Sequence, residues 1–445
     1  MTLAKRAIAT TLVAVAVFVL GASGAFRILR PDDPRGVAAP EALAAPIAMT
    51  GSLEQTIADL QTHLATQPDD AHALATLGLA YSQEAVHTAD PSYYPKAEEA
   101  LQRSLAIEPN DNVDAIVGMG VVANARHDFA DGVRLGKEAA AINPDAAHIL
   151  GVIGDGQLEL GHYRAAFATF DRMVQMRPDI ASYARVSYAR ELRGDVSGAL
   201  RAMREALRAA GTPDDASWVT YQIGELYFRT GRIAPALHAY RRSVALMPTF
   251  VPPHAGLAKI AWARGDLDRA IHGYRWVVAR YPLPEHVIAL GDLYTVAGRD
   301  AQAANEYALA RVEADLFRAS GVNVDVEQAV FQADHGDPST ALADARAGWS
   351  ARKSIGAADA LAWALYRDGR YASAARHARY ALHLGTRDAT YLFHAGMIEL
   401  HLHRRGDARN DLARALAINP HFSILGSRVA ARALRALDGT TSSRP

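Results

Sequence analysis

The chain of 445 residues contains no cysteine. This absence excludes disulfide bonds, thiol catalysis and cysteine-ligated zinc, and it excludes a lipoprotein anchor, which is attached through cysteine. Neither sign of charge is in excess, because 47 Lys and Arg stand against 48 Asp and Glu, for a net charge of −1. A neutral chain gives no electrostatic reason to bind nucleic acid, so no nucleic-acid partner is expected.

Sequence motifs that mark catalytic sites are also missing. The chain has no Gly-rich phosphate loop before a Lys-Ser or Lys-Thr pair, no Gly-x-Ser-x-Gly elbow and no His-Glu-x-x-His. One tight histidine group, His394, His401 and His403 near Glu399, is a poor candidate for metal binding because His403 falls at a predicted helix end. We therefore expect no enzymatic activity, no cofactor and no metal.

What the chain does contain is a small residue that returns in steps of 33 to 38 residues. The members of this series are Ala97, Gly132, Ala166, Ala199, Ala236, Ala270, Ala303, Ala341, Ala374 and Ala408. A repeat of this length is typical of a solenoid, in which each unit buries its apolar face only by stacking on its neighbours.

Each unit has the pattern of a helical hairpin. A glycine such as Gly78 or Gly224 precedes the recurring alanine and permits close helix crossing, and a proline such as Pro248 ends the second helix. Breaker pairs such as Gly231-Arg232 separate the two helices.

The unit resembles the tetratricopeptide repeat. The resemblance rests on Leu74, Leu77, Gly78 and Tyr81 in the first unit, on Gly224, Tyr227, Ala236, Tyr240 and Pro248 in the fifth, and on Gly291, Tyr294, Ala303 and Tyr307 in the seventh. It implies an all-α fold, a right-handed superhelical solenoid of about ten helix-turn-helix units with capping helices.

The pattern divides the chain into consecutive segments. We expect a signal peptide or signal anchor at 1–26, a Pro/Ala-rich spacer at 27–52, a capping half-repeat at 53–69, the repeat array at 70–420, a capping helix at 421–437 and a disordered tail at 438–445. A weak seam is expected near 311–353, where the eighth unit keeps little of the pattern beyond Ala341.

The first segment has the order of an export signal. Lys5-Arg6 precede an uncharged stretch from Ala7 to Phe26 that ends in small residues. About 20 apolar residues also suffice to span a bilayer, so an uncleaved anchor is a competing interpretation, and a buried helix of a cytoplasmic protein is a third. We expect the repeats outside the cytoplasm, either secreted or attached to the membrane by this segment.

The resemblance implies a concave groove, lined by fixed positions of each first helix, that holds a segment of another protein. Those positions hold Asp155, Glu159, Tyr188, Glu191, Trp218, Tyr221, Glu225, Phe228, Arg229, Lys259, Trp262, Glu285, Asp292, Trp363 and Tyr366. Rings contribute contact area and charges fix register, so these residues are candidates for binding a protein or peptide, and the acidic ones favour basic residues in it. The alternative is that the rings pack between neighbouring repeats.

Three functions are compatible with the pattern. The first is a non-catalytic protein-interaction scaffold at the cell envelope. The second is an accessory subunit of an envelope enzyme or secretion complex. The third, an RNA-binding helical repeat, is opposed by the neutral charge, the acidic groove positions and the export signal. The sequence assigns no oligomeric state.

Overall fold

A computed structural model describes residues 52–439, which form 22 helices, α3 to α24, and no strand. The predicted signal or anchor, nearly all of the predicted spacer, and residues 440–445 of the predicted tail lie outside this range. Within it, every helix is too short or too polar to cross a lipid bilayer.

Twenty of these helices pair into ten consecutive hairpins, as the repeat pattern predicts. The first helices are α4 (Ala71–Thr88), α6 (Val113–Ala125), α8 (Ala147–Glu159), α10 (Ile180–Leu192), α12 (Pro213–Arg229), α14 (Pro252–Ala263), α16 (Pro284–Val296), α18 (Asp325–His335), α20 (Ile355–Arg367) and α22 (Ala389–His401). The second helices are α5 (Tyr93–Ile107), α7 (Phe129–Ile142), α9 (Tyr163–Met176), α11 (Val196–Arg208), α13 (Ile233–Leu246), α15 (Leu267–Val278), α17 (Asp300–Ala319), α19 (Pro338–Ala351), α21 (Tyr371–Ala381) and α23 (Arg405–Ile418).

Small residues lie where the helices of these hairpins cross. Ala236 and Ala270 are fully buried, as are most of the recurring alanines. Gly224 and Gly256 lie against the ring of Tyr240, and a Cβ added at either glycine would come within 2.6 Å of a ring carbon. One tyrosine therefore fills the space that two consecutive first helices leave open, which explains why the repeat pairs glycine with an aromatic residue.

Single helices flank the array at both ends. α3 (Leu53–Thr66) packs on α4, and α24 (Gly426–Gly439) packs on α22 and α23. The Ser52 hydroxyl accepts a hydrogen bond from the Gln55 backbone N–H and so caps α3. A reciprocal capping box does not form, because the Gln55 side chain donates to Asp59 instead.

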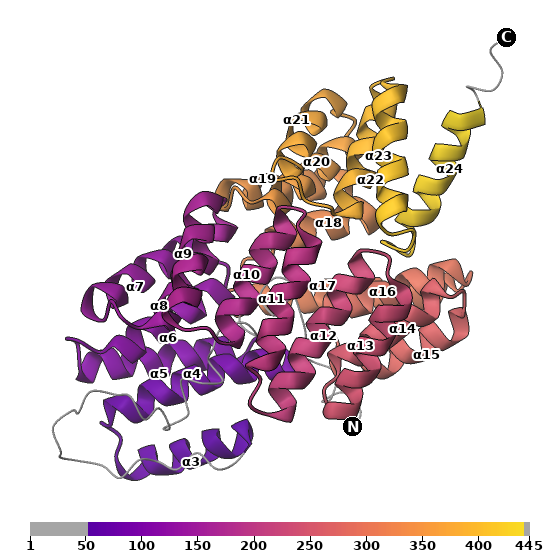
Figure 1. Cartoon of the computed structure of the whole chain (residues 1–445). Coiled ribbons are helices and arrows are strands. Elements are labelled where there is room, and N and C mark those ends of the chain that lie inside the picture. The colour runs from indigo at the N-terminus through magenta and orange to yellow at the C-terminus, as the bar shows by residue number, and fades with distance from the viewer. Residues whose placement is uncertain (1–51, 440–445) are drawn as a thin grey trace.

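The ten hairpins make two superhelical turns that lie directly against each other. In Figure 1 the orange and yellow helices α18 to α23 lie alongside α9 to α12. Hydrogen bonds join the two turns between residues 191 to 196 positions apart, such as Asn419 to the Phe228 carbonyl oxygen at 3.0 Å and Tyr281 to the Val86 carbonyl oxygen at 2.8 Å.

These contacts follow a regular register. Each of the first five hairpins contacts the second turn through the connection between its two helices or through the helix end beside that connection. The segment that it contacts is the linker after the hairpin five positions further along the chain. Gly194, in the turn between α10 and α11, meets the Gly385 carbonyl oxygen before α22, and Gly231, in the turn between α12 and α13, meets the Ile418 carbonyl oxygen at the end of α23. In the third hairpin, the Tyr163 hydroxyl accepts from the Ile355 backbone N–H at 2.6 Å. The second superhelical turn of the array therefore packs directly on the first.

The junction between α17 and α18 falls in the region where the repeat pattern weakens. The two helices make few backbone contacts with each other. The linker between them is held by the first turn instead: the Asn323 N–H donates to the Arg126 carbonyl oxygen, and the Asn323 carbonyl oxygen lies 2.6 Å from His127 Nδ1. Val322 and Val324 are buried in the same core as Tyr94.

Candidate functional site

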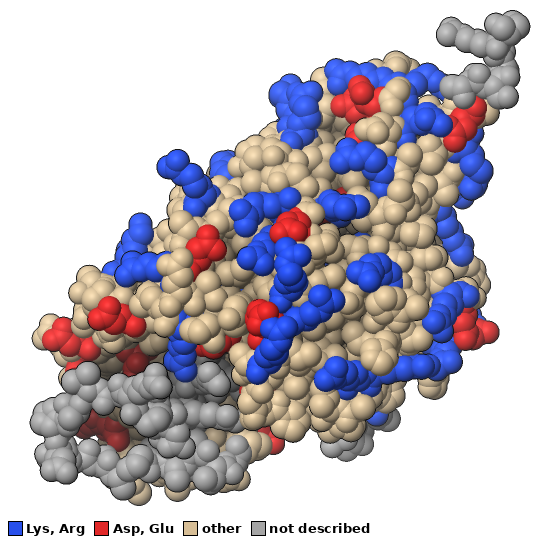
Figure 2. Space-filling view, in the orientation of Figure 1, with Lys and Arg blue, Asp and Glu red and all other residues tan. Residues whose placement is uncertain are grey.

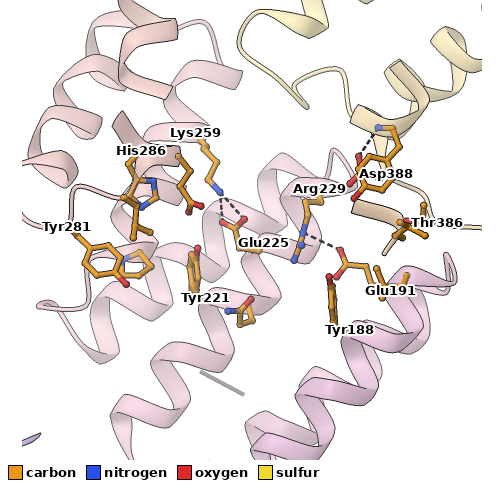
Figure 3. A pocket seen from close by; sticks show the side chains of 17 residues that line it. Tyr188, Glu191, Tyr221, Glu225, Arg229, Lys259, Tyr281, His286, Thr386 and Asp388 are labelled. Atoms are coloured by element: carbon orange, nitrogen blue, oxygen red, sulfur yellow. Dashed lines mark hydrogen bonds and ion pairs between the residues drawn. The ribbon is translucent and has the colours of Figure 1, made fainter. Parts of the chain in front are cut away.

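A cavity of about 270 Å³ remains on the concave side, where the two turns meet. Its lining comes from α10, α12, α14 and α16, from the starts of α20 and α22, and from the linkers before α16 and α22. Figure 3 shows His286 and Tyr281 on one side and Asp388 and Thr386 on the other, with Glu225 between them. The full lining is Tyr188, Glu191, Leu192, Tyr221, Gln222, Glu225, Arg229, Pro252, Lys259, Tyr281, Leu283, Glu285, His286, Ile355, Thr386, Asp388 and Tyr391.

A ladder of ion pairs crosses this cavity, which we call the axial pocket. Glu191, Glu225 and Lys259 occupy the same position in three successive hairpins, 34 residues apart, so the solenoid stacks them along its axis. Lys259 Nζ lies 2.7 and 2.8 Å from the two carboxylate oxygens of Glu225. Arg229, one helical turn beyond Glu225, lies 3.2 Å from Glu191 (Figure 3). The Tyr240 hydroxyl also donates to Glu225 at 2.8 Å.

The axial pocket keeps an excess of carboxylates over cations. Glu285 and Asp388 line it in addition to Glu191 and Glu225, against only Arg229 and Lys259. Glu285 is exposed and forms no ion pair in the described structure. The carboxylate of Asp388 accepts backbone N–H groups at the start of α22. The pocket is therefore suited to a positively charged group.

The pKa values of the lining groups reflect this crowding. Glu285 keeps contact with solvent, but the surrounding protein partly desolvates its carboxylate and raises its pKa, with the nearby Glu225 adding to the effect. Desolvation also raises the pKa of Glu191 and of Asp388 above their usual values. For Glu225 desolvation acts in the same direction, but Lys259 and Arg229 outweigh it and lower the pKa. A bound cation would stabilise the ionised forms of these carboxylates.

His286 does not add a positive charge to the pocket. Its side chain is 5% exposed, and burial together with the charge of Lys259 lowers its pKa to about 3. The imidazole is therefore neutral at pH 7. Its Nε2 atom is buried and has no hydrogen-bond partner in the described structure.

Four tyrosines surround the carboxylates: Tyr188, Tyr221, Tyr281 and Tyr391. Burial raises the pKa of each hydroxyl, so all four rings are neutral. Neutral aromatic rings attract alkylammonium and guanidinium groups through their faces. The combination of rings and carboxylates can hold a lysine or arginine side chain.

Comparison with known proteins yields distant similarities. No protein-family model matches the chain. Protein FlbA of Caulobacter vibrioides is 24% identical over 247 residues, which are 55% of this chain but only 39% of that protein. Solved structures with similarity include a human IFIT1 dimer with PPP-AAAA (14% identity, TM-score 0.46, 75% of this chain and 78% of that chain), yeast Tom70 (13%, 0.38, 88% and 86%) and Pseudomonas aeruginosa PilF (18%, 0.35, 48% and 92%).

The decisive observation lies in the chain itself, where ten successive hairpins carry a small residue at the recurring buried position and six of them carry glycine at the helix crossing. In three of these six, an aromatic ring lies against that glycine: Phe170, Tyr240 and Tyr307. The chain has the architecture of a tetratricopeptide-repeat protein. In this repeat protein the concave positions take four different environments, and only one of them is the axial pocket.

Five of the thirteen principal groove candidates meet in the pocket. These are Tyr188, Glu191, Tyr221, Glu225 and Lys259, and they are joined by Arg229 and Glu285 from the same repeat positions. They lie in the fourth to seventh hairpins, where the concave surface still has open volume.

Asp155 and Glu159 lie in buried ion pairs outside the pocket. Arg185 makes two hydrogen bonds to Asp155, at 2.9 and 2.6 Å, and both side chains are at most 5% exposed. Arg352, from the second turn, lies 3.5 Å from Glu159 and 2.7 Å from Glu327. These carboxylates are already neutralised by residues of the chain.

Three more candidates lie in polar and aromatic clusters of the later hairpins. Asp292 accepts a hydrogen bond from the Tyr307 hydroxyl at 2.8 Å and lies 3.3 Å from His335. Trp363 is 5% exposed and stacks between Tyr366, at 4.6 Å, and His394, at 4.1 Å.

The remaining candidates lie between helices. Trp218 packs, half-buried, against the core of α10 to α12, and Phe228 is buried beside Tyr240. Trp262 meets His421, from the linker after α23, edge to face at 5.6 Å. These three rings form no part of the pocket lining.

Sequence reasoning missed Tyr281, His286, Thr386, Asp388 and Tyr391. Tyr281 lies in a linker, and His286 is not at one of the groove positions. Thr386, Asp388 and Tyr391 come from the second superhelical turn, about five hairpins away. A 34-residue pattern describes nearest neighbours, so it carries no signal for residues that meet across a whole turn.

Proposed function

We propose that this protein is a non-catalytic interaction scaffold that holds a segment of another protein, with a basic side chain of that segment in the axial pocket. The observation that carries the proposal is the convergence of four carboxylates, two cations and four tyrosines on one open volume between two docked turns. Rigid helices form most of its walls, so little conformational entropy is lost on binding.

The charge balance supports a basic segment over an acidic one. Lys259 and Arg229 are already engaged by Glu225 and Glu191, whereas Glu285 has no cation of its own. A lysine or arginine that enters the pocket would pair with Glu285 and Asp388 and lie against the tyrosine rings. An acidic side chain would meet uncompensated like charge.

We also propose that the scaffold works at the cell envelope. The support is the order of basic, apolar and small residues in the first 26 positions. Fusing these residues to a reporter that is active only outside the cytoplasm tests the proposal. A reporter that is produced but stays silent would refute the proposed location.

The binding proposal is tested by crosslinking in the envelope fraction, identification of the captured protein, and calorimetry with its basic segment. We expect Tyr221→Ala to weaken binding by at least about 2 kcal/mol and Glu285→Gln to weaken it about tenfold, with affinity falling as salt rises. The matched control is Trp262→Ala, an aromatic truncation outside the pocket.

Thermal unfolding of each variant separates lost binding from lost structure. Equal affinity of wild type, Tyr221→Ala and Glu285→Gln, with the fold retained, would place the binding surface elsewhere. Equal losses in Tyr221→Ala and Trp262→Ala would indicate an indirect effect.

A further inference from the structure

The near-zero net charge of the chain conceals a strong separation of charge. Residues 52–160, which form α3 to α8, contain 17 Asp and Glu against 5 Lys and Arg. Residues 161–439 contain 36 Lys and Arg against 28 Asp and Glu. The molecule is therefore polarised, although its net charge is close to zero.

Part of this positive charge lies on the second helices of hairpins four to six. Figure 2 shows Lys and Arg side chains spread over the face on which Figure 1 places α11 and α13, with few acidic side chains among them. The exposed arginines on and next to α11, α13 and α15, which we call the outer arginine face, are Arg201, Arg204, Arg208, Arg232, Arg241, Arg242, Arg269, Arg275 and Arg280.

Almost all of these guanidinium groups lack an acidic partner. In the described structure only Arg208 forms an ion pair, with Glu205. Arg204 donates to the Tyr227 hydroxyl, and Arg232 and Arg280 lie over the rings of Tyr227 and Trp276. By contrast, the cations of the axial pocket are paired. The eight arginines without an acidic partner repel one another, and an anionic partner would relieve that repulsion.

The chemistry of this face fits phosphate groups better than a protein surface. Stable protein interfaces have an apolar centre, and the large apolar side chains with the greatest exposure in the described chain, Ile107, Ile142 and Val312, lie on other helices. Guanidinium groups match the geometry of phosphate oxygens through paired N–H donors. Spread over three helices, each about 20 Å long, they cover a broad face rather than a cleft.

We propose that the outer arginine face binds the surface of an anionic phospholipid bilayer. This inference goes beyond the axial pocket but rests on the proposed envelope location, which brings the molecule near a membrane and away from nucleic acid. The 26 residues of the predicted spacer would span at most about 90 Å when fully extended, which is more than four times the length of a helix of this face. The acidic region of α3 to α8 is repelled by the same surface, so the molecule is oriented on it.

The test is arginine footprinting of the full-length protein with phenylglyoxal, read by mass spectrometry. The protein is bound to vesicles of phosphatidylcholine alone, or of equal parts phosphatidylcholine and phosphatidylglycerol. We expect modification of Arg201, Arg241 and Arg275 to slow at least about fivefold on the anionic vesicles only, and to recover in high salt. Arg103, exposed on α5 in the acidic region, is the internal control.

A charge-reversal variant, Arg201→Glu with Arg241→Glu and Arg275→Glu, should abolish the protection of Arg204 and Arg242, whereas Arg103→Glu should not. Equal rates on both kinds of vesicle, or protection that survives the triple reversal, would overturn the proposal. So would protection by single-stranded RNA, or by raising the protein concentration, without protection by the vesicles. Partner binding in the axial pocket should be unchanged in the triple variant, so failure here is distinguishable from failure of the scaffold proposal.

Discussion

The buried pair of Asp155 and Arg185 joins the third and fourth hairpins through two charge-assisted hydrogen bonds. Two buried charges are costly to desolvate, and removing either partner would leave the other uncompensated, at a cost of about 3–5 kcal/mol. The Arg352 guanidinium joins the two superhelical turns in the same way, because it pairs with Glu159 of the first turn and Glu327 of the second. Such pairs fix which helices meet, because any other register would bury an unpaired charge.

His286 provides a residue-scale prediction about pH. Its pKa is about 3 in the folded chain because of burial and Lys259, with Glu225 acting in the opposite direction, and it is about 6.5 when the chain is unfolded. Below pH 6.5 the unfolded state therefore takes up a proton that the folded state does not, so stability falls as pH falls from 6.5 towards 3.

We expect His286→Leu to remove this contribution, which reaches about 1.4 kcal/mol per pH unit. The measurement is the thermal midpoint of both proteins from pH 7 to pH 4. The wild type should lose more stability than the variant over this range, whereas parallel curves would show that His286 titrates normally.

At the scale of the helical hairpin, stability depends on small residues at the crossings. Ala236 is fully buried next to Phe228, Tyr240 and Ile260. Ala236→Leu should destabilise the protein by about 1–3 kcal/mol, because the added carbons have no free volume to occupy. Arg241→Ala, on the outer side of the same helix, should change stability by less than about 0.5 kcal/mol. Hydrogen exchange of α12 and α13 measures the stability of both variants. Equal effects of Ala236→Leu and Arg241→Ala would mean that Ala236 does not lie at a helix crossing.

The hairpins were predictable from sequence because each depends on residues within one or two repeats. Tyr240 lies against Gly224 and shares a core with Ala236, and all three lie within one repeat, so their spacing carries the information. The axial pocket was predictable only in part. Glu225 and Lys259 occupy equivalent positions of successive repeats and follow from the 34-residue spacing, but Asp388 comes from a helix about 160 residues further along. The pairing of Asp155 with Arg185 was not predictable either, since a charge at a groove position has the same sequence signature whether it is solvated or neutralised.

The docking of the two superhelical turns gives a prediction for the whole molecule. Gly231 and Gly265 occupy equivalent turns, with φ angles of 70° and 83°, so alanine is strained at both, at about 1–2 kcal/mol. Only Gly231 lies against the other turn, where a Cβ would come within 2.6 Å of the Ile418 carbonyl oxygen.

Gly231→Ala should therefore lower the thermal midpoint more than Gly265→Ala, and only Gly231→Ala should speed hydrogen exchange around Asn419. Gly265→Ala is the matched control for backbone strain. Equal behaviour of the two variants would mean that the turns do not support each other in solution.

The register in which each early hairpin meets the linker five units later fixes the number of hairpins between two segments that are in contact. In an open array a repeat can be gained or lost with only a change in length. Here, deleting one hairpin from the middle would bring every later linker opposite the wrong turn, so that Asn419 would no longer face Phe228 and Arg352 would no longer face Glu159. The contacts between the two turns therefore require five hairpins per turn, and variation in length is expected at the two ends of the array rather than within it.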